Sequence, residues 1–180
     1  MTDLRTDRPA EDAFPPLPEA LVVPVYDNHT HLDHDRDHSG PQLPPREQLD
    51  RASSVGIRGV VQVGTDLETS RWGAELASHE PRVLAAVALH PTETPGLEAA
   101  GALDEHLAGI AELAGLPRVR AVGETGLDFF RTADEAGRAA QIRAFEAHIE
   151  IAKQRDLALQ IHDRDAHQEV LDTLRRVGAP

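Results

Sequence analysis

The stretch Val22-Val23-Pro24-Val25-Tyr26-Asp27-Asn28-His29-Thr30-His31 is an apolar, β-branched run that ends in polar side chains. Residues of this kind favour an extended backbone, so we expect a strand over residues 22–31. Similar short runs follow, each with sequence of helical period behind it, at residues 59–64, 83–90, 119–124 and 157–162. Alternating strands and helices are typical of βα units around a parallel sheet. We therefore predict an α/β fold of about five such units.

Helices can be placed between these runs. Thr65-Asp66-Leu67-Glu68 has the spacing of a capping box, in which Thr65 accepts from the Glu68 backbone N–H, so we expect a helix to start at Thr65. The Ala-rich segment 97–114 fits packed outer helices. Apolar residues recur at three- and four-residue steps further along, which predicts an amphipathic helix that covers the sheet; they are Ile142, Phe145, Ile149 and Ala152.

The composition limits the class of protein. A chain of 180 residues with 40% hydrophobic residues can bury one core, so we expect one domain over 22–180 after a loose, acidic and proline-rich leader, 1–21. There is no Cys, which excludes a disulfide framework and a thiolate zinc site; a metal would need His, carboxylate or water as ligands. The leader has no apolar segment of membrane length, and we expect a cytoplasmic protein with no membrane contact.

The formal net charge of -13 restricts the partners. A field of this sign repels phosphate backbones, which argues against a protein that coats nucleic acid tightly and without specificity. An anionic substrate would need local positive charge, and bound divalent metals can supply it.

His29 and His31 are the first candidates for such a metal site. Residues two apart on a strand point to the same face, about 6.5–7 Å apart, so two imidazoles can converge on one ion. Asp27 shares this parity and could accept an imidazole N–H, which would fix the tautomer of a ligand. The alternative is a plain pair of polar residues at a strand end.

Two further strand ends carry metal-binding residue types. Glu124 follows the apolar run 119–122 and a glycine, although a glutamate there could also cap the next helix or meet solvent. His162 ends the run 157–161, on the face opposite Leu157, Leu159 and Ile161, although a lone buried His is often only a hydrogen-bonded core residue. Because the carboxyl ends of parallel strands meet on one face, the four residues His29, His31, Glu124 and His162 predict a single site.

Weaker candidates lie close to these strand ends. His90 could contact substrate or donate a proton, or be a structural His before Pro91. Arg164 could hold a phosphate oxygen through its planar fork, or pair with Asp163 or Asp165. In the charged stretch 33–38 we expect solvated side chains rather than a second metal cluster, except that Asp33 is close enough to His31 to support it.

Three longer motifs occur in a fixed order along the chain. They are Asp27-Asn28-His29-Thr30-His31-Leu32-Asp33, Gly123-Glu124-Thr125-Gly126-Leu127-Asp128 and His162-Asp163-Arg164-Asp165-Ala166, with Val63-Gly64-Thr65-Asp66 and Leu89-His90-Pro91 between them. The chain from about Val22 onward resembles the TatD family of metal-dependent DNases in these motifs. The resemblance implies a (β/α)8 TIM-barrel hydrolase with two divalent metal ions that cleaves phosphodiester bonds of DNA, at ends or single strands, by metal-activated water.

The resemblance also assigns roles to residues. It implies that His29 and His31 bind one metal, that His162 binds the second and that Glu124 bridges both, with Asp128 beside the ligands. Related hydrolases of C–N bonds often bridge their metals with a carboxylated lysine at the fourth strand. The only lysine of this sequence is Lys153, on a predicted helix, so that type of site is disfavoured. The ligand types leave Mg²⁺, Mn²⁺ and Zn²⁺ open.

The family pattern continues beyond this sequence. A sixth strand carrying another His and an eighth carrying an Asp are expected, whereas about five units are present here, so we expect this sequence to be part of a longer chain whose first and fifth strands expose unpaired edges. Two other functions stay open. One is a related metal hydrolase acting on an ester or lactone, and the other is an inactive, truncated remnant that binds metal without turnover.

Overall fold

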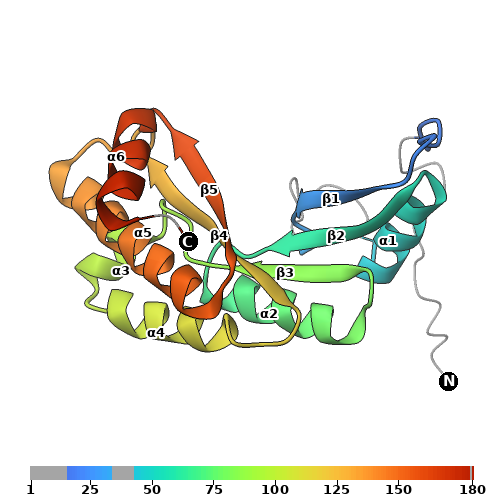
Figure 1. Ribbon diagram of the computed structural model, residues 1–180, viewed down its shortest axis with the longest axis horizontal. Helices are drawn as coiled ribbons and strands as arrows, with labels where there is room; N and C mark the ends of the chain where they lie inside the picture. The colour runs from blue at the N-terminus through green and yellow to red at the C-terminus, as the bar shows by residue number, and fades with distance from the viewer. Residues whose placement is uncertain (1–15, 34–42, 179) are drawn as a thin grey trace, which may run out of the picture.

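The computed structural model describes residues 16–33, 43–178 and 180, and these residues form alternating strands and helices around one parallel sheet (Figure 1). The elements are β1 (Val25–Thr30), α1 (Pro45–Ser54), β2 (Ile57–Val63), α2 (Leu67–His79), β3 (Val83–Val87), α3 (Thr94–Ala99), α4 (Leu103–Leu113), β4 (Val119–Asp128), α5 (Glu135–Arg155), β5 (Ala158–Arg164) and α6 (His167–Val177). The 5-stranded sheet has the order β1-β2-β3-β4-β5, and every neighbouring pair is parallel. The predicted strands are therefore confirmed, in sequence order.

The strand bounds differ from prediction at several ends. β4 continues four residues beyond Glu124, because it keeps pairing with β5 after a register shift between Gly123 and Thr125. β3 ends at Val87, before His90, whose backbone N–H donates to the Thr65 carbonyl at 2.7 Å instead. Residues 22–24 precede β1 rather than belonging to it.

The helix predictions hold with two corrections. Helix α2 starts one residue later than expected: its N-cap is Asp66, whose carboxylate accepts from the Thr69 N–H at 2.7 Å while the Thr69 hydroxyl accepts from the Asp66 N–H at 3.1 Å. The segment 97–114 is divided into α3 and α4 by Gly101, at φ +68. Helix α5 contains the whole predicted amphipathic stretch.

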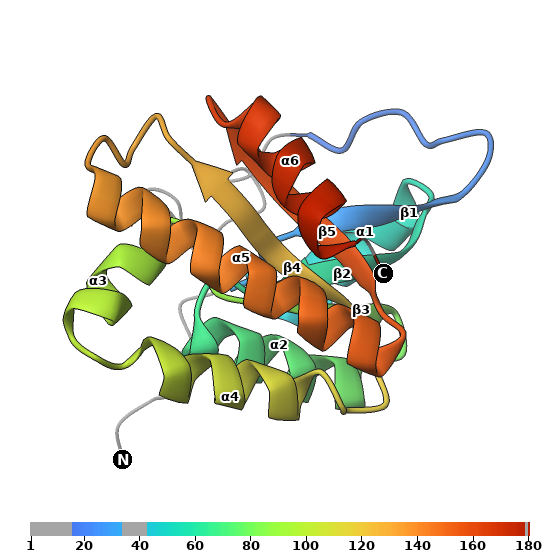
Figure 2. The same ribbon diagram turned by 60° about the vertical axis from the view of Figure 1, so that its left-hand side comes forward.

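The core lies between the sheet and the helices on its outer face (Figure 2). Small, fully buried side chains on β3 let α2 pack closely, and the larger cluster continues beneath α4 and α5. A second cluster joins α5 and α6 to β4; it comprises Leu127, Phe145, Ile149, Ala166 and Val170. Within residues 16–33 and 43–178, none of the helices combines the length and the apolar composition that a bilayer crossing needs.

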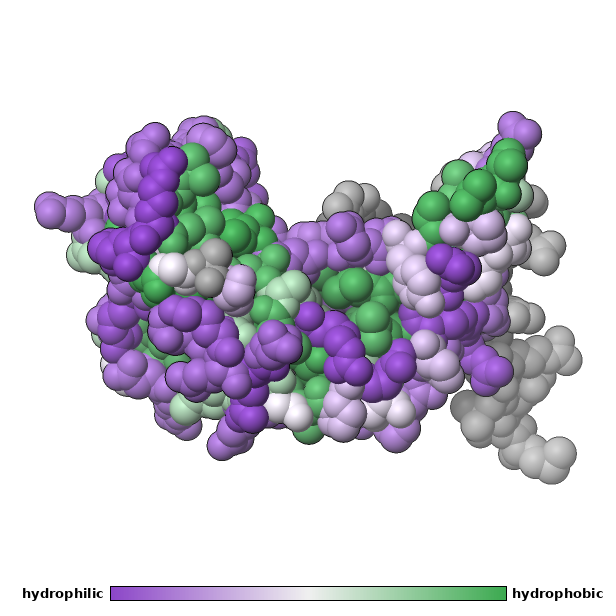
Figure 3. All heavy atoms as spheres, in the orientation of Figure 1, coloured by the Kyte–Doolittle hydropathy of each residue, from purple (hydrophilic) through white to green (hydrophobic). Residues whose placement is uncertain are grey.

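The inner face of the sheet is open between its two edge strands. Figure 1 shows β1 and β5 at opposite edges of the sheet, and Figure 3 shows a trough in the same view, with apolar residues on both sides of it. Exposed apolar residues follow the β1 edge and include Val22, Val23, Val25 and Tyr26, and Ile161 lies on β5. One bond crosses the trough, from Gln160 Nε2 to the Asn28 carbonyl at 2.5 Å. The sheet is thus a half-barrel whose edges are β1 and β5.

Candidate metal centre

The carboxyl end of β1 and the second half of β4 bring three of the predicted residues together. His29 Nε2 lies 3.5 Å from Glu124 Oε2, and the ring centroids of His29 and His31 are 5.2 Å apart. One ligand atom from each of His29, His31 and Glu124 lies within 4.8 Å of the other two. His29 near the end of β1 and His31, which directly follows that strand, therefore both direct a ligand atom toward Glu124.

The tautomer of His31 is set by a backbone carbonyl. His31 Nδ1 lies 3.0 Å from the Val63 carbonyl oxygen at the end of β2, and since a carbonyl only accepts, Nδ1 carries the proton. The lone pair of the neutral ring is then on Nε2. This is the arrangement that metal-binding histidines usually have, with one nitrogen donating to the protein and the other facing the ion.

A second group of ligand types includes a residue that was predicted only as a substrate or proton-transfer group. His90, Glu124 and His162 also have ligand atoms within 4.8 Å of one another. His162 Nδ1 lies 3.0 Å from Glu124 Oε1 and 3.2 Å from His90 Nε2. Glu124 therefore belongs to both groups, with Oε2 directed at His29 and Oε1 at His162.

The charges of this cluster depend on one another. Burial acts to raise the pKa of Glu124, but the hydrogen bond from His162 and the charges of His90 and His29 outweigh it and lower that pKa. The hydrogen bond to Glu124 raises the pKa of His162 against the opposing effect of burial. Burial, followed by the charge of His162, lowers the pKa of His90 to about 4. At neutral pH Glu124 is thus ionised and His90 neutral, and an ion that binds a ring nitrogen of His162 would compete with a proton for it.

Asp128 supports His162 from the interior. Its side chain is 1% exposed, and Oδ2 lies 3.2 Å from His162 Nε2. The Arg131 N–H donates to Asp128 Oδ1 at 2.8 Å, and the Asp128 N–H donates to Gln141 Oε1 at 2.9 Å. Both ring nitrogens of His162 therefore have a carboxylate partner.

Comparisons with known proteins agree with this arrangement. Residues 26–180 match the family described as TatD related DNase. The chain belongs to the TatD family. It is 41% identical over 87% of its length to an uncharacterized metal-dependent hydrolase TatD of Mycobacterium tuberculosis, and 36% identical over 69% to a 3′-5′ ssDNA/RNA exonuclease TatD of Escherichia fergusonii. Among solved structures, YJJV, a TATD homolog from Escherichia coli K12, superposes on 87% of the chain with a TM-score of 0.70 and 25% identity.

This TatD-family chain is short relative to these proteins. It covers 58% and 45% of the two relatives and 57% of the solved chain, so it spans about half the length of the proteins it matches. A structure of a TatD-family hydrolase from Entamoeba histolytica, 20% identical with a TM-score of 0.69, supports the same fold over 56% of its length. The predicted fold, the first five βα units of a TIM-barrel type, is thereby confirmed.

The remaining predicted residues have other contacts. Asp27 Oδ1 accepts from the His29 backbone N–H at 3.1 Å rather than from an imidazole, because a short Asp side chain reaches the backbone two residues on. Arg164 places its Cζ 3.9 Å from the Phe130 ring centroid, and within the described residues it forms no ion pair with Asp163 or Asp165. Residues 34–38 of the charged stretch lie outside the described residues.

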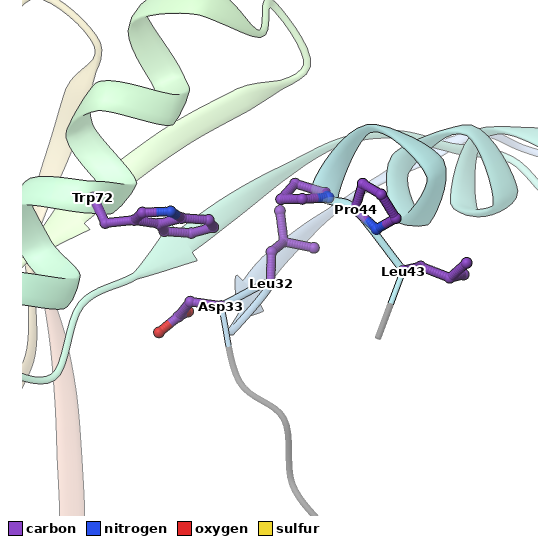
Figure 4. A pocket seen from close by; sticks show the side chains of 6 residues that line it. Leu32, Asp33, Leu43, Pro44 and Trp72 are labelled. Carbon is purple, nitrogen blue, oxygen red and sulfur yellow. The ribbon is translucent and has the colours of Figure 1, made fainter. Parts of the chain in front are cut away.

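Asp33 lies beside a separate cavity. Asp33 Oδ1 accepts from Gln62 Nε2 at 2.5 Å, and Gln62 Oε1 accepts from the Leu32 N–H at 2.7 Å. The carboxylate lies at the mouth of a cavity of about 380 Å³ near the indole of Trp72 (Figure 4). Asp33 thus bonds a residue of β2, and the expected support of His31 stays a prediction.

His148 of α5 was missed by sequence reasoning and connects two of the strand ends. It is fully buried, and Nε2 accepts from the Leu89 N–H at 3.2 Å, next to His90. Nδ1 then carries the proton and lies 2.8 Å from Thr125 Oγ1, next to Glu124. Burial lowers the pKa of His148 to about 3, so the ring is neutral at physiological pH. Helix α5 thereby fixes the relative position of two site residues.

The donor set fits divalent metals. Imidazole nitrogens and carboxylate oxygens are ligands for Zn²⁺ and Mn²⁺, and each group supplies three such atoms. Both groups lie at the carboxyl ends of the strands, where barrel enzymes assemble their sites. The described residues are therefore suited to hold metal, in agreement with the metal-dependent hydrolases among the relatives.

Proposed function

We propose that this site belongs to a divalent-metal-dependent hydrolase that cleaves phosphodiester bonds of nucleic acid, at ends or in single strands. The observation that carries the proposal is the position of Glu124, whose two oxygens face two separate groups of histidines. A carboxylate shared in this way could serve both ions of a two-metal site. The name of the Escherichia fergusonii relative, an ssDNA/RNA exonuclease, supports this class of substrate.

We propose two ions, with Mg²⁺, Mn²⁺ and Zn²⁺ all compatible with the ligands. His29 and His31 would hold one, His162 the other, and Glu124 both; the structure adds His90 as a further candidate ligand of the second. When bound, such ions supply Lewis acidity and positive charge for a scissile phosphate, which a chain of net charge -13 otherwise repels.

The residues of the chain have distinct tasks in this proposal. Asp128 orients His162, and the Val63 carbonyl orients His31. His90 Nδ1 lies 2.7 Å from Thr92 Oγ1, and since a hydroxyl can donate or accept, Thr92 supports either tautomer of His90. His90 can therefore present to the site a lone pair or a proton at Nε2, as a ligand or as a donor to the leaving group.

A metal-binding and hydrolysis experiment tests the proposal. The purified protein is titrated with Mn²⁺ and incubated with end-labelled single-stranded DNA, beside Glu124→Gln and, as a control, Glu98→Gln on exposed helix α3. We expect Mn²⁺ binding and hydrolysis in the wild type and in Glu98→Gln, and loss of both in Glu124→Gln. Hydrolysis unchanged in Glu124→Gln contradicts the site. Mn²⁺ binding without hydrolysis contradicts the activity and favours a metal-binding remnant, while turnover of a lactone alone favours the ester alternative.

A further inference from the structure

An exposed aromatic ring stands at the carboxyl rim of the sheet beside the candidate metal centre. Phe130 is 60% exposed, whereas Leu127 in the same segment is 0% exposed. The guanidinium carbon of Arg164 lies 3.9 Å from the centroid of the Phe130 ring, a cation–π contact. A phenylalanine that keeps most of its surface in water at this position has no role in the core.

The strand register places this pair next to the ligands. On the paired strands, Gly126 lies opposite His162 and Asp128 lies opposite Arg164. Residues two apart on a strand share a face, so Arg164 lies on the face that carries His162, about 6.5–7 Å further along the strand. Phe130 follows Asp128 by two residues, in a segment that the bond from the Phe129 N–H to the Arg164 carbonyl, 2.9 Å, keeps beside β5.

The segment that carries Phe130 is fixed on both sides of the ring. On one side Asp128 accepts from the Arg131 N–H at 2.8 Å. On the other, the Thr132 hydroxyl accepts from Gln141 Nε2 at 2.8 Å, and the Thr132 carbonyl accepts from Arg138 Nε at 2.9 Å. The ring is therefore held in its exposed position by its neighbours, so a partner that stacks on it would have little loop entropy to overcome.

The charge of Arg164 is available to an anion. Of the adjacent carboxylates, Asp163 faces His167, with 2.8 Å between Oδ2 and Nδ1, and among the described residues no carboxylate lies within ion-pair distance of Arg164. Arg131 adds a second positive charge to this rim. A planar guanidinium binds a phosphate in a bidentate manner while it stacks on an aromatic ring.

We propose that Phe130 and Arg164 form a platform for one nucleotide of a single-stranded nucleic acid, with the base stacked on Phe130 and its phosphate held by Arg164. The inference rests on the proposed function and adds the residues that bind the strand next to the cleavage point. It requires single strands because only an unstacked base can offer its face to a protein ring, and stacking of this kind is tolerant of sequence.

Equilibrium binding without turnover tests the platform. Binding of a labelled oligothymidylate in EDTA is compared between the wild type, Phe130→Ala and Phe130→Tyr, with Leu116→Ala as the control; Leu116 is 44% exposed and precedes β4, at the opposite end of the sheet. We expect Phe130→Ala to weaken binding about 5- to 100-fold, and Phe130→Tyr and Leu116→Ala to bind like the wild type.

An abasic oligonucleotide separates stacking from charge. Phe130→Ala is expected to leave abasic binding unchanged, whereas Arg164→Gln weakens both oligonucleotides and lowers the salt dependence by about one phosphate contact. Equal binding of the wild type and Phe130→Ala to oligothymidylate overturns the platform, as does equal weakening toward the abasic strand. The binding assay contains no metal, so it is independent of hydrolysis. Weaker oligothymidylate binding in Phe130→Ala, with Leu116→Ala unchanged, upholds the platform even if hydrolysis is never seen. Hydrolysis by a protein whose binding is unaffected by Phe130→Ala overturns the platform but leaves the proposed function standing.

Discussion

The two ends of the sheet both carry ionisable side chains, but these have different partners. At the amino end, before β3, Arg82 bonds Glu80 Oε2 at 2.8 Å and Asp50 Oδ1 at 2.7 Å, so cation and anions neutralise each other directly. At the carboxyl end, Glu124 and Asp128 are held by imidazoles and backbone N–H groups. In the described residues no Lys or Arg side chain pairs with either of these two carboxylates.

The difference separates a structural end from a functional one. A guanidinium keeps its proton at any ordinary pH, so the carboxylates beside Arg82 are permanently satisfied. Imidazoles can lose theirs, so the carboxylates at the other end can exchange a proton-bearing partner for a metal ion. The two ends should therefore respond differently to mutation: the amino end in stability alone, and the carboxyl end in metal binding as well.

The largest effect is expected at His148, which ties the carboxyl ends of β3 and β4 together. His148→Leu leaves the buried Leu89 N–H and the Thr125 hydroxyl without partners, and we expect a loss of about 2–4 kcal/mol in the free energy of unfolding. Chemical denaturation measures it. His148→Gln, which keeps a donor and an acceptor, serves as the control and should recover part of the loss; an unchanged midpoint in His148→Leu would show that these bonds do not stabilise the fold.

The same residue predicts a dependence of stability on pH. The folded chain holds the pKa of His148 at about 3, below its ordinary value of 6.5. Between these values the unfolded chain binds a proton that the folded chain rejects, so stability from this group is full above about 6.5 and falls as the pH is lowered toward 3. Denaturation at several pH values should show that the free energy of unfolding falls less steeply with decreasing pH in His148→Leu than in the wild type. Equal slopes in the two proteins would contradict the lowered pKa of His148.

Two aspartates at the carboxyl end of the sheet, Asp128 and Asp27, should differ in their effect on metal affinity. Asp128 is buried against His162, whereas the Asp27 carboxylate accepts from the backbone N–H of His29. We expect Asp128→Asn to lower Mn²⁺ affinity about 10- to 100-fold, measured by calorimetry, and Asp27→Asn to change it much less. Equal losses in the two variants would mean that Asp27 also supports a ligand ring, as its parity on the strand suggested.

Sequence alone could predict which candidate ligand residues lie close together, because their placement is local. The two-residue period puts His29 and His31 on one face, and parallel strands bring their carboxyl ends to one edge, so Glu124 and His162 follow without knowledge of packing. The exact strand ends could not be predicted in the same way, because β4 extends to Asp128 only through its register with β5.

The supporting residues depend on how α5 docks against the sheet. His148 bonds Leu89 and Thr125, which are 59 and 23 residues away, and nothing in its own helical pattern specifies those partners. Local competition explains two further differences from the sequence prediction. Asp27 bonds the nearby backbone. Asp66 caps α2 better than Thr65 because its carboxylate reaches the Thr69 N–H.

The smallest effect is expected at the amino end and depends on pH. Bonding to Arg82, against a smaller opposing effect of burial, lowers the pKa of Glu80 from 4.5 to about 2. Stability from this pair is therefore present above about pH 4.5 and lost as the pH falls toward 2. Arg82→Met should lower the free energy of unfolding by about 1 kcal/mol at neutral pH and by less at pH 2.5, as measured by chemical denaturation. It should leave Mn²⁺ affinity unchanged. Arg143→Met, which removes the exposed ion pairs with Glu98 and Asp104, is the control and should lower the free energy of unfolding by less still. A change in Mn²⁺ affinity in Arg82→Met would break the distinction between the two ends, because it would couple a saturated ion pair to ligands at the other end of the sheet.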